Sequence, residues 1–75
     1  MPTINLVKTG ENIVTLRNRN KMTVRDLQRS FGFSTPQAIY KWQKGQALPT
    51  VDNLVILAML FNVNIDDILV LDRIS

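Results

Sequence analysis

The sequence TVRDLQRSFGFSTPQAIYKWQKG, residues 23–45, has the pattern of two short helices joined by a tight turn. Thr23 is suited to cap the first helix because its hydroxyl can accept a hydrogen bond from a free backbone N–H. Asp26, three residues later, can bind the backbone N–H of Thr23 in return. These two residues predict a helix over residues 24–31, followed by a turn that begins with Gly32.

The second half of this stretch predicts a helix over residues 36–44. Thr35 is placed to cap it, Pro36 fits its first position, and Gly45 suits a left-handed residue at its end. Two helices joined by a short turn that contains glycine form a helix-turn-helix. The second helix would present a row of long polar side chains, which is what recognition of a DNA major groove requires.

Apolar spacing predicts a further helix over about residues 10–19, with Ile13 and Leu16 directed inward. Residues 1–9 alternate apolar and polar side chains, as an edge strand or an arm laid over the core would. Seventy-five residues are enough for one small core. We therefore expect one domain over residues 10–75, with a C-terminal helix, and an N-terminal arm or short strand over residues 1–9.

Two very apolar helices are predicted after the helix-turn-helix, one beginning at the Thr50 cap and one running from the Asn64 cap to Ile74. Asp66 and Asp67 lie in the first turn of the last helix, where the helix dipole favours anions. From the second helix onward, the side chains expected in the core are Val24 or Leu27, Phe31, Ala38 or Ile39, Trp42, Leu48, Val51, Leu54, Leu57, Ala58, Phe61, Ile65, Ile68 and Leu69.

The net charge of +3 conceals an uneven distribution. Residues 1–45 carry eight bases against two acids, a net charge of +6. Residues 46–75 carry one base against four acids, a net charge of −3. The N-terminal part is therefore suited to approach phosphates, and the C-terminal part is not.

Composition argues against several other classes of protein. The chain has no cysteine and no histidine, so a disulfide and the usual zinc ligand sets are not expected. Its longest apolar run, residues 54–61, is far shorter than a membrane span, and no secretory signal is evident. A glycine-rich phosphate loop is also missing. We expect no enzyme activity, no cofactor, no metal, no membrane association and no small-molecule ligand, with cytoplasm as the location.

The order of these features resembles the XRE, or lambda-repressor/Cro-type, helix-turn-helix domain family over about residues 10–70. The resemblance implies an all-α, compact five-helix bundle, lambda-repressor-like, that binds double-stranded DNA. It rests on Leu16, Arg17, Leu27, Gly32, Phe33, Ile39, Tyr40, Lys41, Trp42, Gln43, Lys44, Gly45, Pro49, Leu54, Leu57, Ala58, Asn64, Ile65, Asp66, Asp67, Ile68 and Leu69.

Two departures from the family pattern matter for recognition. Val24 stands where the family usually has a glutamine that touches phosphate and braces the next helix. The turn also contains one more residue than the repressor pattern. The base-reading register at the front of helix 36–44 is therefore open by one residue.

The resemblance and the chemistry of the groove assign roles to side chains around the second helix. Gln37 and Lys41, four residues apart on one face, are suited to read adenine and guanine respectively; the alternative is an ordinary solvated face. The predicted base-reading set is Thr35, Pro36, Gln37, Tyr40 and Lys41. The predicted phosphate-binding set is Arg17, Thr23, Val24, Arg25 and Lys44.

Arg17 and Gln43 match a family pair in which the arginine meets an acidic residue. With glutamine instead, the link would be a hydrogen bond that leaves Arg17 fully charged toward DNA.

More apolar side chains are present in the last two helices than one small core needs. A two-fold homodimer on a near-palindromic operator would bury them, and tight internal packing is the alternative. The surplus residues are Ile56, Met59, Val70, Leu71 and Ile74.

The function that these patterns favour is a sequence-specific DNA-binding transcriptional regulator, expected to be a repressor. One alternative is an antitoxin-like autorepressor that binds a toxin through its last two helices. The other is a protein-interaction module without DNA binding.

Overall fold

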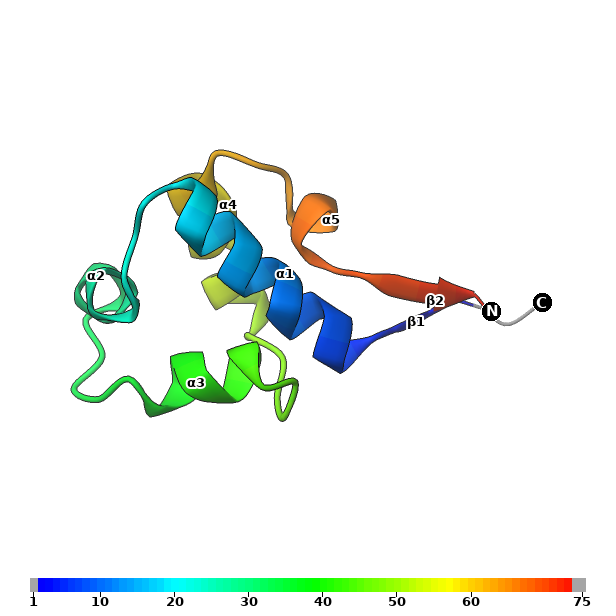
Figure 1. Ribbon diagram of the computed structural model, residues 1–75, viewed down its shortest axis with the longest axis horizontal. Coiled ribbons are helices and arrows are strands. Elements are labelled where there is room, and N and C mark those ends of the chain that lie inside the picture. The colour runs from blue at the N-terminus through cyan, green and yellow to red at the C-terminus, as the bar shows by residue number, and fades with distance from the viewer. Residues whose placement is uncertain (1, 74–75) are drawn as a thin grey trace.

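The computed structural model describes residues 2–73, which form five helices and two short strands (Figure 1). The predicted all-α, five-helix fold is confirmed, and the strands form a small ribbon at one end of the helical body. In chain order the elements are β1 (Pro2–Ile4), α1 (Leu6–Arg19), α2 (Val24–Phe31), α3 (Gln37–Gln43), α4 (Val51–Phe61), α5 (Ile65–Ile68) and β2 (Leu71–Arg73).

One hydrophobic core joins all five helices, and it agrees closely with the predicted one. Val51 and Leu48 are exceptions: Val51 is 73 % exposed at the first residue of α4, and Leu48 is half-buried but does not belong to the core cluster. The inward stripe of α4 begins one turn later. The buried apolar residues are Ile13, Leu16, Leu27, Ile39, Trp42, Leu54, Leu57, Ala58, Phe61 and Ile68.

The first helix starts earlier than the sequence pattern predicted. Asn5 caps it, because the side-chain oxygen of Asn5 accepts a hydrogen bond from the backbone N–H of Lys8 at 2.8 Å. Residues 6–9 are therefore helical, and the predicted boundary at Gly10 is wrong.

The last helix is much shorter than predicted, because α5 ends at Ile68 and Leu69 has an extended backbone. The N–H of Val70 donates to the buried hydroxyl of Thr9 at 2.9 Å, and its carbonyl accepts from Asn5 N at 2.8 Å. These bonds to the N-terminal segment replace the ones that a continued helix would make. The predicted helix over residues 64–74 is therefore wrong beyond residue 68.

Strand β2 pairs antiparallel with β1, with Ile4 opposite Leu71 and Thr3 opposite Asp72. A side-chain bond from Asn5 Nδ2 to Asp72 Oδ2, 2.9 Å long, reinforces the pairing. The prediction of a short N-terminal strand thus agrees with β1, whereas residues 71–73, predicted as helix, form the partner strand β2. Ile74 lies outside the described residues.

Two further features bear on function. None of the described helices has the length and apolar character to cross a membrane. Within residues 2–73, no three histidine, cysteine or acidic side chains gather where they could hold a metal ion.

Candidate nucleic-acid interface

A capping box fixes the start of α2, as predicted. The N–H of Asp26 donates to the Thr23 hydroxyl at 3.0 Å, and the N–H of Thr23 donates to the Asp26 carboxylate at 2.7 Å. The bond from the Thr23 N–H to the carboxylate lowers the pKa of the Asp26 carboxyl, and the Thr23 side chain adds to this effect. The next free N–H groups at this helix start point out of the helix, where an anion is favoured.

The turn between α2 and α3 occupies residues 32–36. Gly32 ends α2 with a positive φ of 70°, a conformation that suits glycine. Gln28 then braces the turn, because its side-chain amide donates to the Phe33 carbonyl at 3.2 Å. Sequence reasoning missed this brace.

The front of α3 differs by one residue from the prediction. Pro36 is the residue before the helix, and no side chain caps the helix start. The closest approach is from Gln37 N to the Thr35 hydroxyl, at 3.5 Å, which is at the limit for a hydrogen bond. The predicted cap at Thr35 and the predicted helical Pro36 are therefore wrong, because the bend of residues 34–36 separates them from the helix.

Three aromatic rings hold α3 against α2. Phe31 stacks on Phe33 with ring centroids 5.0 Å apart. Trp42 packs against both rings in a T-shaped arrangement, with ring centroids 5.4 Å from Phe31 and 6.0 Å from Phe33. The recognition helix is thus fixed by its buried side.

The other side of α3 faces solvent. Gln37, Lys41 and Lys44 are exposed, and Tyr40 beside them is 44 % exposed. Together with Gln46, which follows the helix, they line a shallow hollow of about 400 Å³. The structure thus brings together three predicted base-reading residues and one predicted phosphate-binding residue, and it adds Gln46, which sequence reasoning missed.

The remaining base-reading candidates precede the helix. Thr35 is exposed and Pro36 is half-buried, and neither lines the hollow. Gln37 is the first residue of α3. Helix-turn-helix proteins read bases mainly with the first residues of the second helix, so the predicted base-reading role of Gln37 is compatible with its place and stays a prediction.

Arg17 lies behind α3 and ties it to the rest of the fold. Its Nε donates to Gln43 Oε1 at 3.0 Å, as predicted, and its Nη1 donates to the Met22 carbonyl at 2.8 Å. These bonds use two of the five N–H groups of the guanidinium. The structure thus gives Arg17 a role in positioning α3, and its predicted contact with phosphate stays a prediction.

The other phosphate candidates divide into exposed and packed side chains. Thr23, Arg25 and Lys44 are exposed. Val24 packs against the core, so only its backbone N–H at the start of α2 is suited to meet an anion. A packed valine in the first turn could be recognised from its spacing with Leu27 and Phe31.

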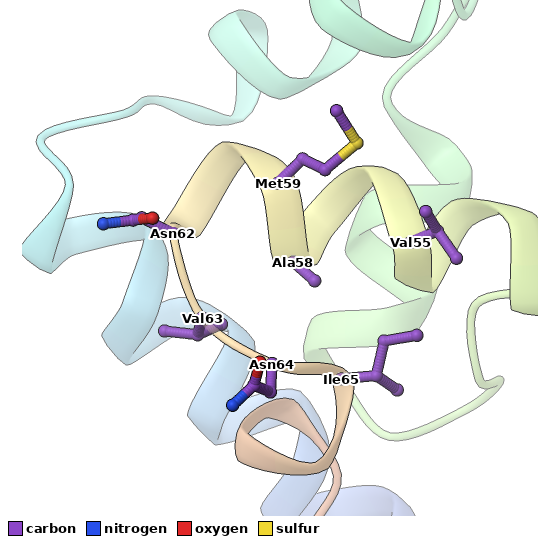
Figure 2. Close-up of a pocket in the computed structure, with 7 residues that line it drawn as sticks. All are labelled: Val55, Ala58, Met59, Asn62, Val63, Asn64 and Ile65. Carbon is purple, nitrogen blue, oxygen red and sulfur yellow. The ribbon is translucent and has the colours of Figure 1, made fainter.

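The described residues of the predicted dimer interface come from two parts of the fold. Ile56 and Met59 are exposed on α4, Met59 at 76 %. Met59 borders a hollow of about 440 Å³ whose other walls come from α4 and the connection to α5, including Ala58 and Ile65 (Figure 2). Val70 and Leu71 line a different hollow beside α1.

Comparison with known proteins agrees with this geometry. The sequence profile of the helix-turn-helix family matches residues 13–68, whereas no curated protein sequence matches the chain. One similar crystal structure is the restriction-modification controller protein C.AhdI from Aeromonas hydrophila, with a TM-score of 0.73 and 21 % identity. The similarity covers 84 % of this chain and 94 % of that one.

A second similar structure is the DNA-binding domain of BldD, with a TM-score of 0.71 and 18 % identity, covering 87 % of this chain and 93 % of that one. At these identities the two structures establish the shared fold. The family match, which spans most of the chain, establishes more: this chain belongs to the XRE-type helix-turn-helix family of DNA-binding regulators.

Proposed function

We propose that this protein is a transcriptional repressor that occupies a near-palindromic operator with α3 in the major groove. The observation that carries the proposal is the outward face of α3. There Gln37, Tyr40 and Lys41 stand exposed in one row, while Ile39 and Trp42 anchor the opposite face. Glutamine and lysine offer the hydrogen-bond patterns that distinguish adenine and guanine in this groove.

The electrostatics of the chain support this orientation. Thr23, Arg25 and Lys44 lie on the helix-turn-helix, whereas three of the four aspartates of the C-terminal part lie on α5 or β2. Backbone N–H groups at the start of α2, including that of Val24, add a site for phosphate. Affinity would therefore come from phosphate contacts around α2 and α3, and sequence preference from the face of α3.

The proposed repressor is a homodimer. The predicted interface included Val70, Leu71 and Ile74 as residues of a long last helix. Because α5 ends at Ile68, Val70 and Leu71 do not belong to a helix face that could form the interface. Ile56 and Met59 on α4 remain candidates for the interface, because both are exposed and Met59 borders a hollow lined by uncharged residues (Figure 2). A two-fold contact centred on these residues would give the operator its two half-sites.

The two similar structures support a regulatory role in general terms, since one is described as a controller protein and the other as a DNA-binding domain. An antitoxin-like autorepressor is the second candidate, favoured by the same exposed α4 surface, which a toxin could cover instead of a second copy.

Selection of bound sites from random duplex DNA tests the proposal directly. We expect one enriched sequence with two related half-sites, and an affinity for it that falls steeply with salt concentration as phosphate contacts release counterions. A protein-interaction module without DNA function would enrich no sequence and would show no salt-dependent binding. Enrichment of a single, unpaired half-site would overturn the dimer but not the DNA binding.

A further inference from the structure

Gly10, in the second turn of α1, allows the backbones of α1 and α3 to touch. It is buried, and a methyl carbon added there would overlap the carbonyl oxygen of Trp42 and lie 2.6 Å from that of Gln43. Alanine is the better helix former, so a glycine inside a helix needs another reason. Here the reason is steric: the last carbonyls of the recognition helix occupy the space of a side chain.

A second close approach lies beside the first. Gly45, directly after α3, has a φ of 72°, and a methyl carbon there would come within 2.7 Å of Val7 Cα and 2.9 Å of Val7 N. Glycine is therefore required at position 45 for two reasons: the positive φ, and the close contact with the first turn of α1. The two contacts together define a seat, formed by Val7 and Gly10, on which the C-terminal end of α3 rests.

The seat is itself held firmly. The cap residue Asn5 bonds to Lys8 N inside α1, and to Val70 and Asp72 in the C-terminal segment. The hydroxyl of Thr9, between the two seat residues, is 1 % exposed and accepts from Val70 N. The first turns of α1 are thus braced from the side opposite α3.

We infer that Gly10 and Val7 are positioning residues for DNA recognition: they set the tilt of α3, and hence how Lys41 reaches the groove. This inference rests on the proposed function. Neither residue lies on the exposed face of α3, and both precede the segment that matches the family, residues 13–68. The aromatic cluster and Arg17 hold the helix from its buried side, and the seat fixes its C-terminal end.

The test compares Gly10→Ala with wild type on the duplex obtained by selection and on random duplex. Alanine should push the end of α3 away from α1. Affinity for the selected duplex should fall at least about tenfold, equivalent to one lost base contact. Affinity for random duplex, and its salt dependence, should change less than about twofold, because the phosphate-binding groups remain on the same surface.

A matched variant separates positioning from loss of stability. Ile68→Val removes a methyl group from a fully buried residue of α5, away from the seat, and lowers stability without moving α3. It should bind the selected duplex like wild type at a temperature where both variants are folded. Equal losses of affinity in Ile68→Val and Gly10→Ala would overturn the inference, as would Gly10→Ala binding the selected duplex within about twofold of wild type.

Gly45→Asn keeps the inference falsifiable if Gly10→Ala does not fold. Asparagine adopts a positive φ more readily than other side chains, but its Cβ at this position would come within 2.7 Å of Val7 Cα. The matched control is Gly32→Asn, where φ is also positive, at 70°, and no neighbouring part of the fold lies within 4 Å of an added Cβ. We expect about a threefold loss on the selected duplex for Gly45→Asn and no loss for Gly32→Asn. Wild-type binding by Gly45→Asn would reject the seat. Failure of the proposed function is distinguishable, since wild type itself would then select no sequence.

Discussion

Helices α3 and α4 are neighbours in the sequence and share one core, yet their outward faces are opposite in chemistry. The outward face of α3 is long, polar and basic, with Gln37, Lys41 and Lys44. That of α4 is apolar, with Val55 at 43 % and Met59 at 76 % exposed. Since both helices bury enough apolar surface to fold, stability does not explain the outward residues. The difference supports the proposal that α3 binds DNA and α4 binds a protein surface.

The largest expected effect is on the core that the two helices share. Trp42→Ala should lower the free energy of unfolding by about 3–5 kcal/mol, because the indole is 4 % exposed and packs on two phenylalanine rings. So small a domain should then be largely unfolded. Tyr40→Ala, on the outward face of the same helix, is the control and should change the melting temperature little. An unchanged melting temperature in Trp42→Ala, with loss of DNA binding, would mean that the indole meets DNA instead.

The second largest effect concerns the outward face of α4, which is proposed to form the dimer while α3 binds DNA. Met59→Glu should shift the protein to monomer and weaken binding to a paired site by about tenfold or more, because it places a charge in the proposed interface. Binding to a single half-site should stay the same. Sedimentation and titration of both duplexes measure this. Asn18→Glu, an exposed position at the end of α1, is the control for added charge in the sedimentation experiment.

Leu71→Glu tests whether the strand β2 belongs to the same dimer interface as Met59. Leu71 is 53 % exposed but lies on β2, in a hollow that does not include Met59. A shift to monomer in both variants would extend the interface to the strand ribbon. A dimer that persists in both would show that its interface lies elsewhere and would contradict the proposed α4 contact.

The smallest effect concerns the start of α2. Hydrogen bonds from Thr23 lower the pKa of Asp26 below its ordinary value of 3.8. A carboxyl with a lower pKa in the folded state stabilises the fold above the unfolded pKa, and this contribution is lost as the pH falls through the folded pKa. Asp26→Asn should therefore lose less stability than wild type between about pH 5 and about pH 3. Urea unfolding at both pH values measures this, with Asp52→Asn, an exposed position in the first turn of α4, as the control. Equal acid sensitivity of wild type and Asp26→Asn would contradict the role of the capping box.

The contrast between the two faces was readable from the sequence because it depends on local signals. The Thr23 capping box, the Gly32 and Gly45 helix ends and the apolar spacing of Leu27 with Phe31 each involve residues within one or two turns. Local signals of this kind predicted the five helices, and the outward side chains of α3 followed from them.

The sequence pattern did not reveal what depends on distant contacts. The C-terminal residues became a strand because Asn5 and Thr9, about sixty residues away, bind Val70 and Asp72. An apolar run such as Leu69 to Leu71 suits a helix or a strand equally well. Which of the two forms therefore depends on the segment that pairs with it, here the N-terminal residues. Gln28 and Gln46 were missed for a related reason, since their places depend on how the chain turns at each end of α3.

The base preference of Gln37→Ala and Lys41→Ala shows directly whether the outward face of α3 reads DNA sequence. Each variant is titrated against the selected duplex and against duplexes with single base changes, with Lys44→Ala as the phosphate-contact control. Each base-reading variant should lose about 1–3 kcal/mol of discrimination at particular positions, whereas Lys44→Ala should weaken binding to all duplexes evenly and reduce the salt slope by about one. If Gln37→Ala and Lys41→Ala keep the wild-type preference and only bind all duplexes more weakly, the outward face of α3 does not read the bases, and the central claim is contradicted.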